Sequence, residues 1–336
     1  MVELRDIPTT SFLGKAIGFF GPMNGGKTED LIREMKRAWY YDFNSIAYNS
    51  ARNTREKDAI ITDGKVHFPA KTVGGFSELT ADLKKRVKQL SSSENGGMME
   101  IEGVRHYKGL PLKVVGIDEI NLAVLTEQEA REAVAFMTYC REERLALFVA
   151  GLLYDFRMMD FGHINELLPY LDLFEIKKPA CMDLRNGNKK CANTASHSQR
   201  VWSYDFVREQ GVERLFEAVE PFDFVDSDKE RIIGDYVPAP FFDRTVRIEE
   251  ERDGRIKYLP VCVEAVRLPY KEETFRVYDA IIRKCSLRDA VPNKLLLDQI
   301  VDFLVRESWV KHDDKKGFTP VSCFKNRQGG YTPVAL

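Results

Sequence analysis

A glycine-rich segment with a lysine and a threonine, GPMNGGKT at residues 21–28, has the residue types that hold phosphate groups. It fits the pattern G-x-x-x-x-G-K-[ST], in which consecutive backbone N–H groups wrap around phosphate oxygens and the glycines allow their close approach. An apolar run at residues 16–20 precedes it and an amphipathic pattern follows, which is the strand–loop–helix context that this motif requires. We therefore expect Lys27 to reach the β- and γ-phosphates of ATP and Thr28 to bind Mg²⁺.

Two adjacent carboxylates, Asp118 and Glu119, end a second apolar run at residues 114–117. The phosphate-binding segment at residues 21–28 is called the P-loop. We expect the strand that ends at Asp118 to lie beside the strand before the P-loop, so that Asp118 meets Mg²⁺ directly or through water. Glu119 then faces the γ-phosphate and can accept a proton from an attacking hydroxyl or water. These charges alone leave a kinase, an ATPase and a helicase open, because all three need them. The expected contacts to ATP and Mg²⁺ are Gly21, Pro22, Met23, Asn24, Gly25, Gly26, Lys27, Thr28 and Asp118.

The elements that must position these groups alternate between short apolar runs and longer helical patterns. Near-continuous apolar runs are typical of strands that are buried on both faces of a parallel sheet. The runs lie at residues 16–20, 45–48, 112–117 and 145–150, and the helical patterns at residues 31–39, 79–90 and 127–140. This alternation predicts an α/β fold with a parallel sheet.

The alternation stops after about residue 175, and the 336 residues are enough for two or three domains. Short strand-like pieces follow in residues 176–268, with a charged hairpin at 248–258. Residues 269–336 have mostly helical patterns, the clearest at 295–305. We expect a P-loop α/β domain over 1–175, a small β domain over 176–268 and an extension of unassigned role over 269–336.

Composition excludes several classes of protein. Hydrophobic residues make up 44% of the chain and charged residues 30%, as in proteins with a sizeable core, and the six cysteines are too few for a disulfide-stapled scaffold. Fifty Lys and Arg against fifty-two Asp and Glu give a net charge of −2, so no overall basic field attracts nucleic acid or an acidic membrane. The chain has neither an N-terminal signal-peptide pattern nor a run of 18 apolar residues. We expect a cytoplasmic protein without membrane or nucleic-acid partners.

Taken in order, the motifs resemble those of the type II thymidine kinase family, whose members are thymidine kinase 1-like. The P-loop is similar to the family's G-P-M-x-[SG]-G-K-[ST], and residues 116–119 match its G-I-D-E. The other matching stretches are AGL at 150–152 with Phe156 and FG at 161–162, INELLP at 164–169, Cys181 and Cys191 followed by ASHSQR at 195–200, and YLPVC at 258–262.

The resemblance implies an ATP-dependent thymidine kinase, a RecA-like P-loop core and a homotetramer or homodimer. Glu119 takes the position of the base that deprotonates the nucleoside 5′-hydroxyl. Lys27 and Arg55 take the positions of the groups that surround the transferred phosphoryl. Tyr258 matches a tyrosine of the lasso loop that closes over thymidine. The nucleoside pocket implied by the resemblance consists of Met23, Leu122, Leu152, Phe156, Phe161, Ser198, Ile233, Gly234 and Tyr258.

Several positions depart from the family's pattern. The family's D-x-R reads Asn53-Thr54-Arg55, so the arginine is kept and the carboxylate is not. After Glu119 the usual G-Q-F-F is replaced by a sequence that places Leu122 where an aromatic residue stands. These changes affect the nucleoside pocket rather than the phosphate site. The alternatives that stay open are a kinase for another or modified pyrimidine nucleoside, a nucleic-acid-stimulated P-loop ATPase and a nucleotide-binding protein without turnover.

The resemblance also implies a zinc site formed by Cys181, Cys191 and Cys262. A structural zinc site needs four ligands, and Ala265 stands where the family has a Cys or His. His197, Asp183 and Cys285 are substitutes to consider, and buried thiols without a metal are the alternative. We expect Cys140, Cys285 and Cys323 to be packing residues.

Overall fold

The chain forms two compact units, each built from more than one stretch of sequence. The first unit comprises Met1–Asp183, Lys190–Gln199 and Tyr258–Val266, and the second comprises Leu184–Lys189, Arg200–Lys257 and Arg267–Leu336. The computed structural model describes residues 7–53, 58–62, 64–92, 96–101, 104–185, 189–243, 253–307, 309–313 and 317–321. In these residues, no helix is long and apolar enough to cross a membrane.

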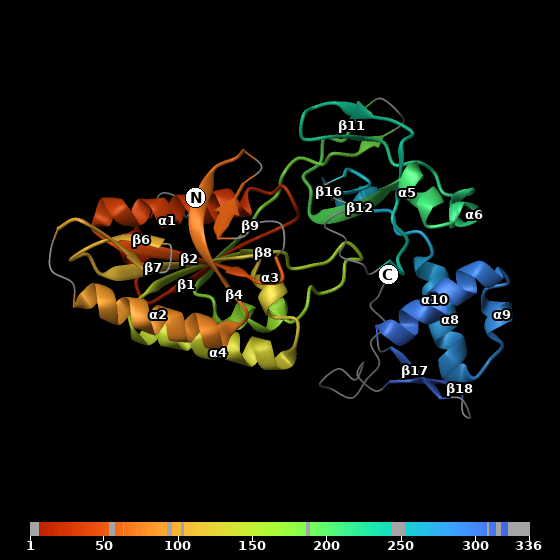
Figure 1. Ribbon diagram of the computed structural model, residues 1–336. Coiled ribbons are helices and arrows are strands. Elements are labelled where there is room, and N and C mark those ends of the chain that lie inside the picture. The colour runs from red at the N-terminus through yellow and green to blue at the C-terminus, as the bar shows by residue number, and fades with distance from the viewer. Residues whose placement is uncertain are drawn as a thin grey trace. The chain divides into compact units, whose positions relative to one another are not determined.

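A seven-stranded sheet forms the centre of the first unit, in the order β3-β4-β2-β7-β8-β1-β9 (Figure 1). Its strands are β1 (Ala16–Phe20), β2 (Asn44–Ser50), β3 (Ala59–Ile61), β4 (His67–Val73), β7 (Leu112–Asp118), β8 (Ala146–Gly151) and β9 (Leu173–Ile176). β3 pairs antiparallel with β4, and the other pairings are parallel. The predicted α/β fold with a mostly parallel sheet is therefore confirmed.

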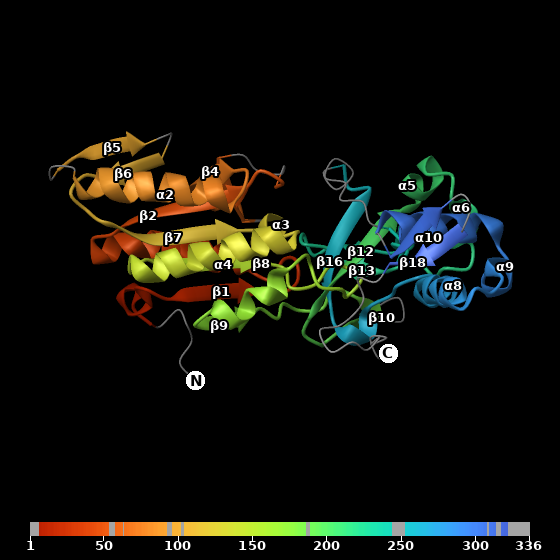
Figure 2. The ribbon, with the colours of Figure 1, turned by 90° about the horizontal axis from the view of Figure 1, so that it is seen from below.

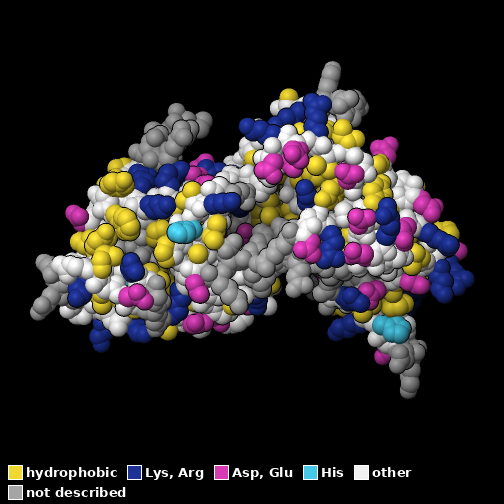
Figure 3. All heavy atoms as spheres, turned by 45° about the horizontal axis from the view of Figure 1, so that its top comes forward, with side chains coloured by type: hydrophobic (Ala, Val, Ile, Leu, Met, Phe, Trp, Pro, Cys, Tyr) yellow, Lys and Arg dark blue, Asp and Glu magenta, His cyan; other side chains and the backbone are white. Residues whose placement is uncertain are grey.

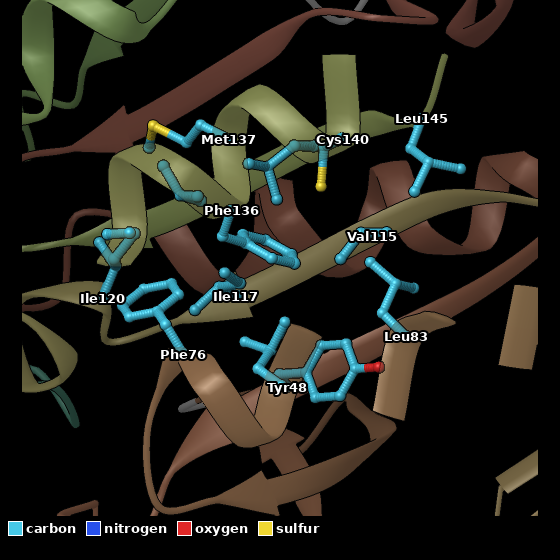
Figure 4. Close-up of a cluster of buried hydrophobic side chains, with 14 of the residues drawn as sticks. Tyr48, Phe76, Leu83, Val115, Ile117, Ile120, Phe136, Met137, Cys140 and Leu145 are labelled. Atoms are coloured by element: carbon cyan, nitrogen blue, oxygen red, sulfur yellow. The ribbon is translucent and has the colours of Figure 1, made fainter. Parts of the chain in front are cut away.

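Helices cover both faces of this sheet (Figures 1 and 2). α1 (Lys27–Arg37) contributes Leu31 and Met35 to the buried cluster on one face. α2 (Phe76–Ser91) and α4 (Glu127–Glu142) contribute Leu83 and Phe136 to the cluster on the other face, part of which is drawn in Figure 4. Burial on both sides explains the near-continuous apolar sequences of β1, β7 and β8.

The end of α1 differs from the predicted pattern. The helical pattern over residues 31–39 predicts a helix that includes Trp39, but the α-helix ends at Arg37 and a 3-10 turn, Ala38–Tyr41, follows. Asp42, with a φ of 55°, closes that turn. Because the tighter turn rotates its side chains away from the α-helical stripe, Trp39 is 54% exposed.

A hairpin of β5 (Met98–Ile101) and β6 (Val104–Tyr107) follows α2 in a region that the sequence pattern left unassigned. Asn44 fixes its base, since its Nδ2 donates hydrogen bonds to the Tyr107 and Leu110 carbonyls, both at 2.8 Å. The backbone N–H of Tyr107 donates to Asn44 Oδ1 at 2.9 Å. The hairpin is thus attached to the start of β2 by polar contacts as well as by Ile101, which is buried.

A buried carboxylate, Asp82 of α2, gathers three donors between α2 and the sheet. Its oxygens accept hydrogen bonds from Tyr48 Oη, Lys71 Nζ and Arg86 Nε, each at 2.7 Å. Burial raises the pKa of Asp82, but the hydrogen bonds from Arg86, Lys71 and Tyr48 outweigh it and bring the pKa to about 2. The carboxylate therefore stays charged and paired at neutral pH.

Arg86 connects this carboxylate to the β5–β6 hairpin. Its Nη1 donates to the Ile101 carbonyl at 2.8 Å and lies 3.2 Å from His106 Nε2. His106 is 1% exposed, and burial together with the Arg86 charge lowers its pKa to about 4. The imidazole is therefore neutral in the folded protein and accepts a hydrogen bond from the guanidinium.

This histidine makes the stability of the chain depend on pH. The pKa of His106 is lower in the folded state than the ordinary value of 6.5, so its contribution is complete above pH 6.5 and is lost as the pH falls toward 4. We expect the free energy of unfolding to fall by about 2 kcal/mol between pH 7.5 and pH 5 because of His106 alone. Urea unfolding at both pH values measures it, and the variant His106→Asn should lose that part of the pH dependence. An equal pH dependence in both proteins would contradict this assignment.

The second unit contains short strands and the helices of the C-terminal region. The elements after β9 are β10 (Leu184–Arg185), β11 (Lys189–Lys190), β12 (His197–Ser203), α5 (Tyr204–Glu209), α6 (Glu213–Phe216), β13 (Phe224–Val225), β14 (Arg231–Ile232), β15 (Tyr236–Pro238), β16 (Ile256–Val261), α8 (Lys271–Arg283), α9 (Leu287–Ala290), α10 (Lys294–Arg306), β17 (Val310–Asp313) and β18 (Gly317–Pro320). Residues 248–252 of the expected hairpin lie outside the described residues.

Trp309 is the centre of the aromatic core of the C-terminal region. Its ring lies 5.9 Å from Phe275, 5.6 Å from Tyr278 and 5.5 Å from Phe303, measured between centroids. These ring contacts join α8 and α10 to Trp309, which directly precedes the β17–β18 hairpin. The helical pattern of this region did not predict that hairpin. On the face in Figure 3, basic and acidic side chains are interspersed, in keeping with the net charge of −2.

Candidate active site

The phosphate-binding loop joins the end of β1 to the start of α1. Gly21 has a φ of 141° and Gly26 a φ of 77°, conformations that side chains rarely adopt. A Cβ atom on Gly21 would also lie 2.6 Å from the carbonyl oxygen of Lys177, closer than real contacts allow. The spacing of the two glycines is therefore a requirement of the turn that the backbone makes here.

Lys27 is the first residue of α1, which has 11 residues and turns its N-terminal end toward the loop. Its side chain is buried, and its Nζ donates a hydrogen bond to the Pro22 carbonyl at 2.7 Å. The ammonium group is thus held against the loop. A positive charge and a helix N-terminus at one place form an anion site.

Thr28 and Asp118 meet at the same edge of the sheet. Thr28 Oγ1 lies 3.3 Å from both carboxylate oxygens of Asp118 at the end of β7. We expected β7 beside β1, and this is wrong, because β8 pairs with both strands and lies between them. The first turn of α1 reaches past the end of β8 to the acidic pair, so the contact forms without adjacent strands.

The surroundings of Asp118 match the chemistry of a magnesium site. Burial and the neighbouring Glu119 charge raise the pKa of Asp118 to about 7, although Lys27 and Thr28 act in the opposite direction. A buried carboxylate and a hydroxyl supply the oxygen ligands that Mg²⁺ prefers. A divalent cation between them would balance the negative charge that burial makes unfavourable.

Glu119 has a backbone conformation that is uncommon for a residue with a side chain. Its φ is 48°, and it stands before the short helix α3 (Ile120–Ala123). The left-handed conformation turns the chain sharply at the end of β7. Such strain is concentrated at functional sites in proteins. Here it places the half-buried Glu119 on the wall of a cavity.

One cavity of about 200 Å³ brings the phosphate loop and the acidic pair together. It is lined by Met23, Asn24, Gly25, Gly26, Lys27, Thr28, Glu29, Asn49, Asn53, Ala59, Ile60, Ile61, Thr62, Asp118 and Glu119. Asn49 was missed by the sequence analysis. It is 1% exposed and accepts a hydrogen bond from Asn53 Nδ2 at 3.1 Å. Its place directly after an apolar run could have pointed to it.

The residues expected to line the nucleoside pocket are only partly brought together. The backbone N–H of Met23 donates to Ser198 Oγ at 3.0 Å, so these two positions are in contact. Phe156 is 8% exposed, and Phe161 and Tyr258 are half-buried, but none of these three lines the cavity.

Two further expected contacts surround the turn after β8. Leu152 is 8% exposed, and its backbone N–H donates to Asn121 Oδ1 at 2.9 Å. Asn121 is buried in α3, the helix that also holds the half-buried Leu122. This amide therefore fixes the turn after β8 against α3.

The remaining expected residues lie elsewhere. Ile233, which is 49% exposed, and Gly234, whose N–H donates to Asp223 Oδ1 at 2.9 Å, belong to the second unit. Arg55 lies outside the described residues, within 54–57.

Three buried cysteines of the first unit form a thiol cluster. The sulfur atoms of Cys181, Cys191 and Cys262 all lie within 4.8 Å of one another. Cys181 Sγ accepts a hydrogen bond from the backbone N–H of Cys262 at 3.2 Å, and burial raises the pKa of the Cys181 thiol to about 12. Ala265, which stands where the family has a Cys or His, is buried at the end of the 3-10 turn that follows and has no ligand atom to offer.

The substitutes considered for the fourth ligand do not join this cluster. Among the described residues, the converging group contains the three cysteines and neither His197 nor Asp183. Cys140 is buried in α4, and Cys285 is exposed. Cys323 lies outside the described residues. The donor set therefore supplies three of the four ligands of a structural zinc site.

A P-loop at the end of a parallel strand, with a Thr–Asp pair and an adjacent glutamate beside it, defines a P-loop nucleotide-binding protein. A sequence model of the family described as "Thymidine kinase" matches residues 15–219. The chain belongs to the thymidine kinase family, whose members transfer phosphate from ATP to thymidine in nucleoside salvage. The matched part contains the P-loop, the acidic pair and the first two cysteines of the thiol cluster.

Two relatives show how far the sequence has diverged. The chain is 24% identical to a thymidine kinase of Mesoplasma florum over 203 residues, and this match covers 60% of this chain and 83% of that protein. Over 183 residues it is 27% identical to a thymidine kinase of Mycoplasmoides gallisepticum, covering 54% of this chain and 65% of that protein.

Proposed function

We propose that the P-loop cavity transfers the γ-phosphoryl group of ATP to the 5′-hydroxyl of thymidine, with the residues of this chain in the following roles. The observation that carries the proposal is the convergence of Lys27, the Thr28–Asp118 pair and Glu119 on one cavity. The P-loop amides and Lys27 hold and neutralise the phosphates, and Thr28 and Asp118 hold Mg²⁺, which supplies charge neutralisation when bound.

Glu119 acts as the base in this proposal. Its carboxylate accepts the proton of the nucleoside 5′-hydroxyl as the oxygen attacks the γ-phosphorus, while the bond to the β,γ-bridging oxygen breaks and ADP leaves. Arg55 stabilises the charge on the transferred group. The αL conformation of Glu119 supports its role, since it directs the residue toward the cavity.

The nucleoside is held in our proposal by residues close to the phosphate site. The contact between Met23 and Ser198 links the P-loop to the start of β12 and supports a shared role of the two. The further pocket residues in this proposal are those of the first unit, Leu122, Leu152, Phe156, Phe161 and Tyr258.

A substrate panel tests the proposal. The chain is incubated with ATP, Mg²⁺ and thymidine, deoxyuridine, deoxycytidine or a purine nucleoside, and both the nucleoside monophosphate and free phosphate are measured. We expect thymidine monophosphate to form faster than the other products, with little phosphate release in the absence of an acceptor. Thymidine turnover equal to that of unrelated nucleosides would contradict the proposed specificity for thymidine. Phosphate release without any acceptor would indicate an ATPase.

The thiol cluster is the candidate for a structural zinc site. We propose that Cys181, Cys191 and Cys262 bind one Zn²⁺ as thiolates, with a fourth ligand that Ala265 does not supply. Because the ion would bind only the folded chain, it would stabilise the first unit.

Metal analysis of the purified protein tests this site. We expect about one zinc per chain in the wild type, and a loss of zinc with a lower midpoint of thermal unfolding in Cys191→Ser, because the chelating set is broken. Cys285→Ser replaces an exposed thiol and is the matched control, with unchanged zinc content. A metal-free wild type whose stability is unaffected by chelators would leave these residues as packed thiols.

The organisation of the whole chain is part of the same proposal. We propose a kinase domain over 1–175, a lasso and zinc-knuckle module over 176–268 and a C-terminal extension over 269–336. We further propose that the protein is a cytoplasmic homotetramer or homodimer. Light scattering of the purified protein measures the mass of the oligomer.

A further inference from the structure

The residue that follows β9, Lys177, lies against the P-loop. Its backbone N–H donates to the Phe20 carbonyl at 2.7 Å, which extends the β1–β9 pairing to the last residue before the loop. Cβ atoms placed on Gly21 and Gly25 would lie 3.0 Å and 3.2 Å from the Cβ atom of Lys177. The P-loop therefore rests against this one residue at two of its glycines.

The side chain of Lys177 contacts the first turn of α1 through a carboxylate. Its Nζ forms an ion pair with Asp30 Oδ2 and donates a hydrogen bond to Glu175 Oε1 at 2.6 Å. The other oxygen of Asp30 pairs with Arg33. Burial lowers the pKa of Lys177, but its hydrogen bonds to Asp30 and Glu175 outweigh burial and raise the pKa above the usual value. Lys177 is therefore charged at neutral pH and neutralises one oxygen of Asp30.

Asp30 is also close to the lysine of the P-loop along α1. Residues three apart share one face of an α-helix, so Asp30 is the neighbour of Lys27 on that face. Both residues are buried, each with 7% exposure, and the backbone N–H of Asp30 donates to the Gly26 carbonyl at 3.2 Å. A carboxylate at this position attracts the Lys27 ammonium group and repels the phosphates of ATP unless a cation neutralises it.

The two cations that pair with Asp30 are not equivalent. The side chain of Lys177 is 18% exposed, whereas that of Arg33 is 36% exposed. Water and salt screen the less exposed pair less, so Lys177 supplies the stronger neutralisation. Lys177 also contacts the P-loop through its backbone. One residue thus supports the loop and neutralises the carboxylate beside it.

We propose that Lys177 is a positioning residue for phosphoryl transfer, which neutralises Asp30 and thereby prevents that carboxylate from drawing the Lys27 ammonium group away from the phosphates of ATP. Without Lys177, Asp30 Oδ2 would accept a hydrogen bond from Lys27 Nζ, which donates to the Pro22 carbonyl at 2.7 Å. Lys177 does not touch the phosphates in this proposal and acts through Asp30. The inference rests on the proposed role of Lys27, and Lys27→Ala tests that role separately.

Titration of the full chain with a non-hydrolysable ATP analogue and Mg²⁺ tests the inference. Lys177→Met should raise the dissociation constant about tenfold, whereas Lys177→Arg keeps the charge and should stay within about threefold of the wild type. Lys177→Gln keeps a hydrogen-bond donor without the charge and should raise the dissociation constant at least about threefold. Lys178→Met replaces the exposed neighbouring lysine and is the matched control, with an unchanged dissociation constant.

A second substitution distinguishes this role from a structural one. Asp30→Asn leaves no carboxylate to neutralise, so adding Lys177→Met to it should change the affinity for the ATP analogue less than about twofold. A residue with only a structural role would give the same loss with and without Asp30→Asn. Steady-state kinetics supply a second readout, in which Lys177→Met should raise the KM for ATP and leave the KM for thymidine within about twofold.

Thermal unfolding midpoints establish which variants are folded, and either Lys177→Met or Lys177→Gln alone suffices for the test. Unchanged affinity for the ATP analogue in these variants, or an equal loss with and without Asp30→Asn, would overturn the inference. If Lys27→Ala also leaves the affinity unchanged, the proposed phosphate site is wrong as well. A loss in Lys27→Ala together with unchanged Lys177 variants would contradict the role of Lys177 alone.

Discussion

Replacing Glu119 with glutamine is expected to lower the rate of phosphoryl transfer to thymidine by at least about 100-fold, the usual effect of removing a positioned general base. The amide has nearly the same shape as the carboxylate but cannot accept the proton of the attacking hydroxyl. Because Glu119 acts on the nucleoside hydroxyl in the proposed function and does not hold ATP, the affinity for ATP should change much less than kcat. Steady-state kinetics with varied ATP and thymidine separate the two quantities.

A matched control for this variant is available on α4. Glu127→Gln removes an equally flexible carboxylate that is 66% exposed and pairs with Arg131, and it should leave kcat unchanged. The fold of both variants can be compared by their thermal unfolding midpoints. Full activity of Glu119→Gln would remove Glu119 from the role of base, and the same loss in both variants would indicate an indirect effect.

Replacing Lys27 with alanine is the second large effect that we expect. Lys27 Nζ donates a hydrogen bond to the Pro22 carbonyl at the start of α1, and in the proposed function its charge neutralises the phosphates of ATP. Loss of one such preorganised charge costs about 100- to 1000-fold in kcat, and here it also removes a ground-state contact to ATP. We therefore expect kcat to fall by that factor and the affinity for a non-hydrolysable ATP analogue to fall with it.

The control for Lys27 lies on the same helix. Lys36→Ala removes an exposed lysine from the last turn of α1 and should change neither quantity. Calorimetric titration with the ATP analogue measures the affinity, and single-turnover kinetics measure the chemical step. Wild-type binding and turnover in Lys27→Ala would contradict the assignment of residues 21–28 as a phosphate-binding loop.

The local parts of the fold and site could be predicted from the sequence. A strand that is buried on both faces needs a continuous apolar run, so residues 16–20 and 112–117 were identified from composition alone. The P-loop is also local, because its glycine and lysine spacing determines the turn that it forms. In both cases the residues that determine the structure are neighbours in the chain.

The position of strands relative to one another was not accessible in the same way. β8 lies between β1 and β7 because of pairings between strands far apart in sequence, and no pattern within 145–150 specifies its neighbours. The exposure of Trp39 depends on where α1 changes to a 3-10 turn, and the position of such a change at a helix end is not determined by the helical pattern. Such outcomes follow from packing rather than from local composition.

The cavities were the least predictable features. Asn49 became a wall of the P-loop cavity because β2 ends at the same edge as β7, with Asn49 opposite Asp118. In the second unit, Trp202 and Phe303 line one cavity although they are about a hundred residues apart. Isolated aromatics fill cores more often than they bind ligands, and these two are 6% and 2% exposed, so they are part of the core.

The division into two units has a consequence for how this protein can be dissected. The chain passes from one unit to the other after residues 183, 189, 199, 257 and 266, so neither unit is a continuous stretch of sequence. A fragment that ends near residue 220 contains the whole family match but lacks Tyr258–Val266, and with it Cys262. No single cut separates the two units, and the shortest N-terminal fragment with a complete first unit extends to residue 266. Truncation is therefore a poor way to study the C-terminal region, and internal replacements that keep the chain continuous are the better one.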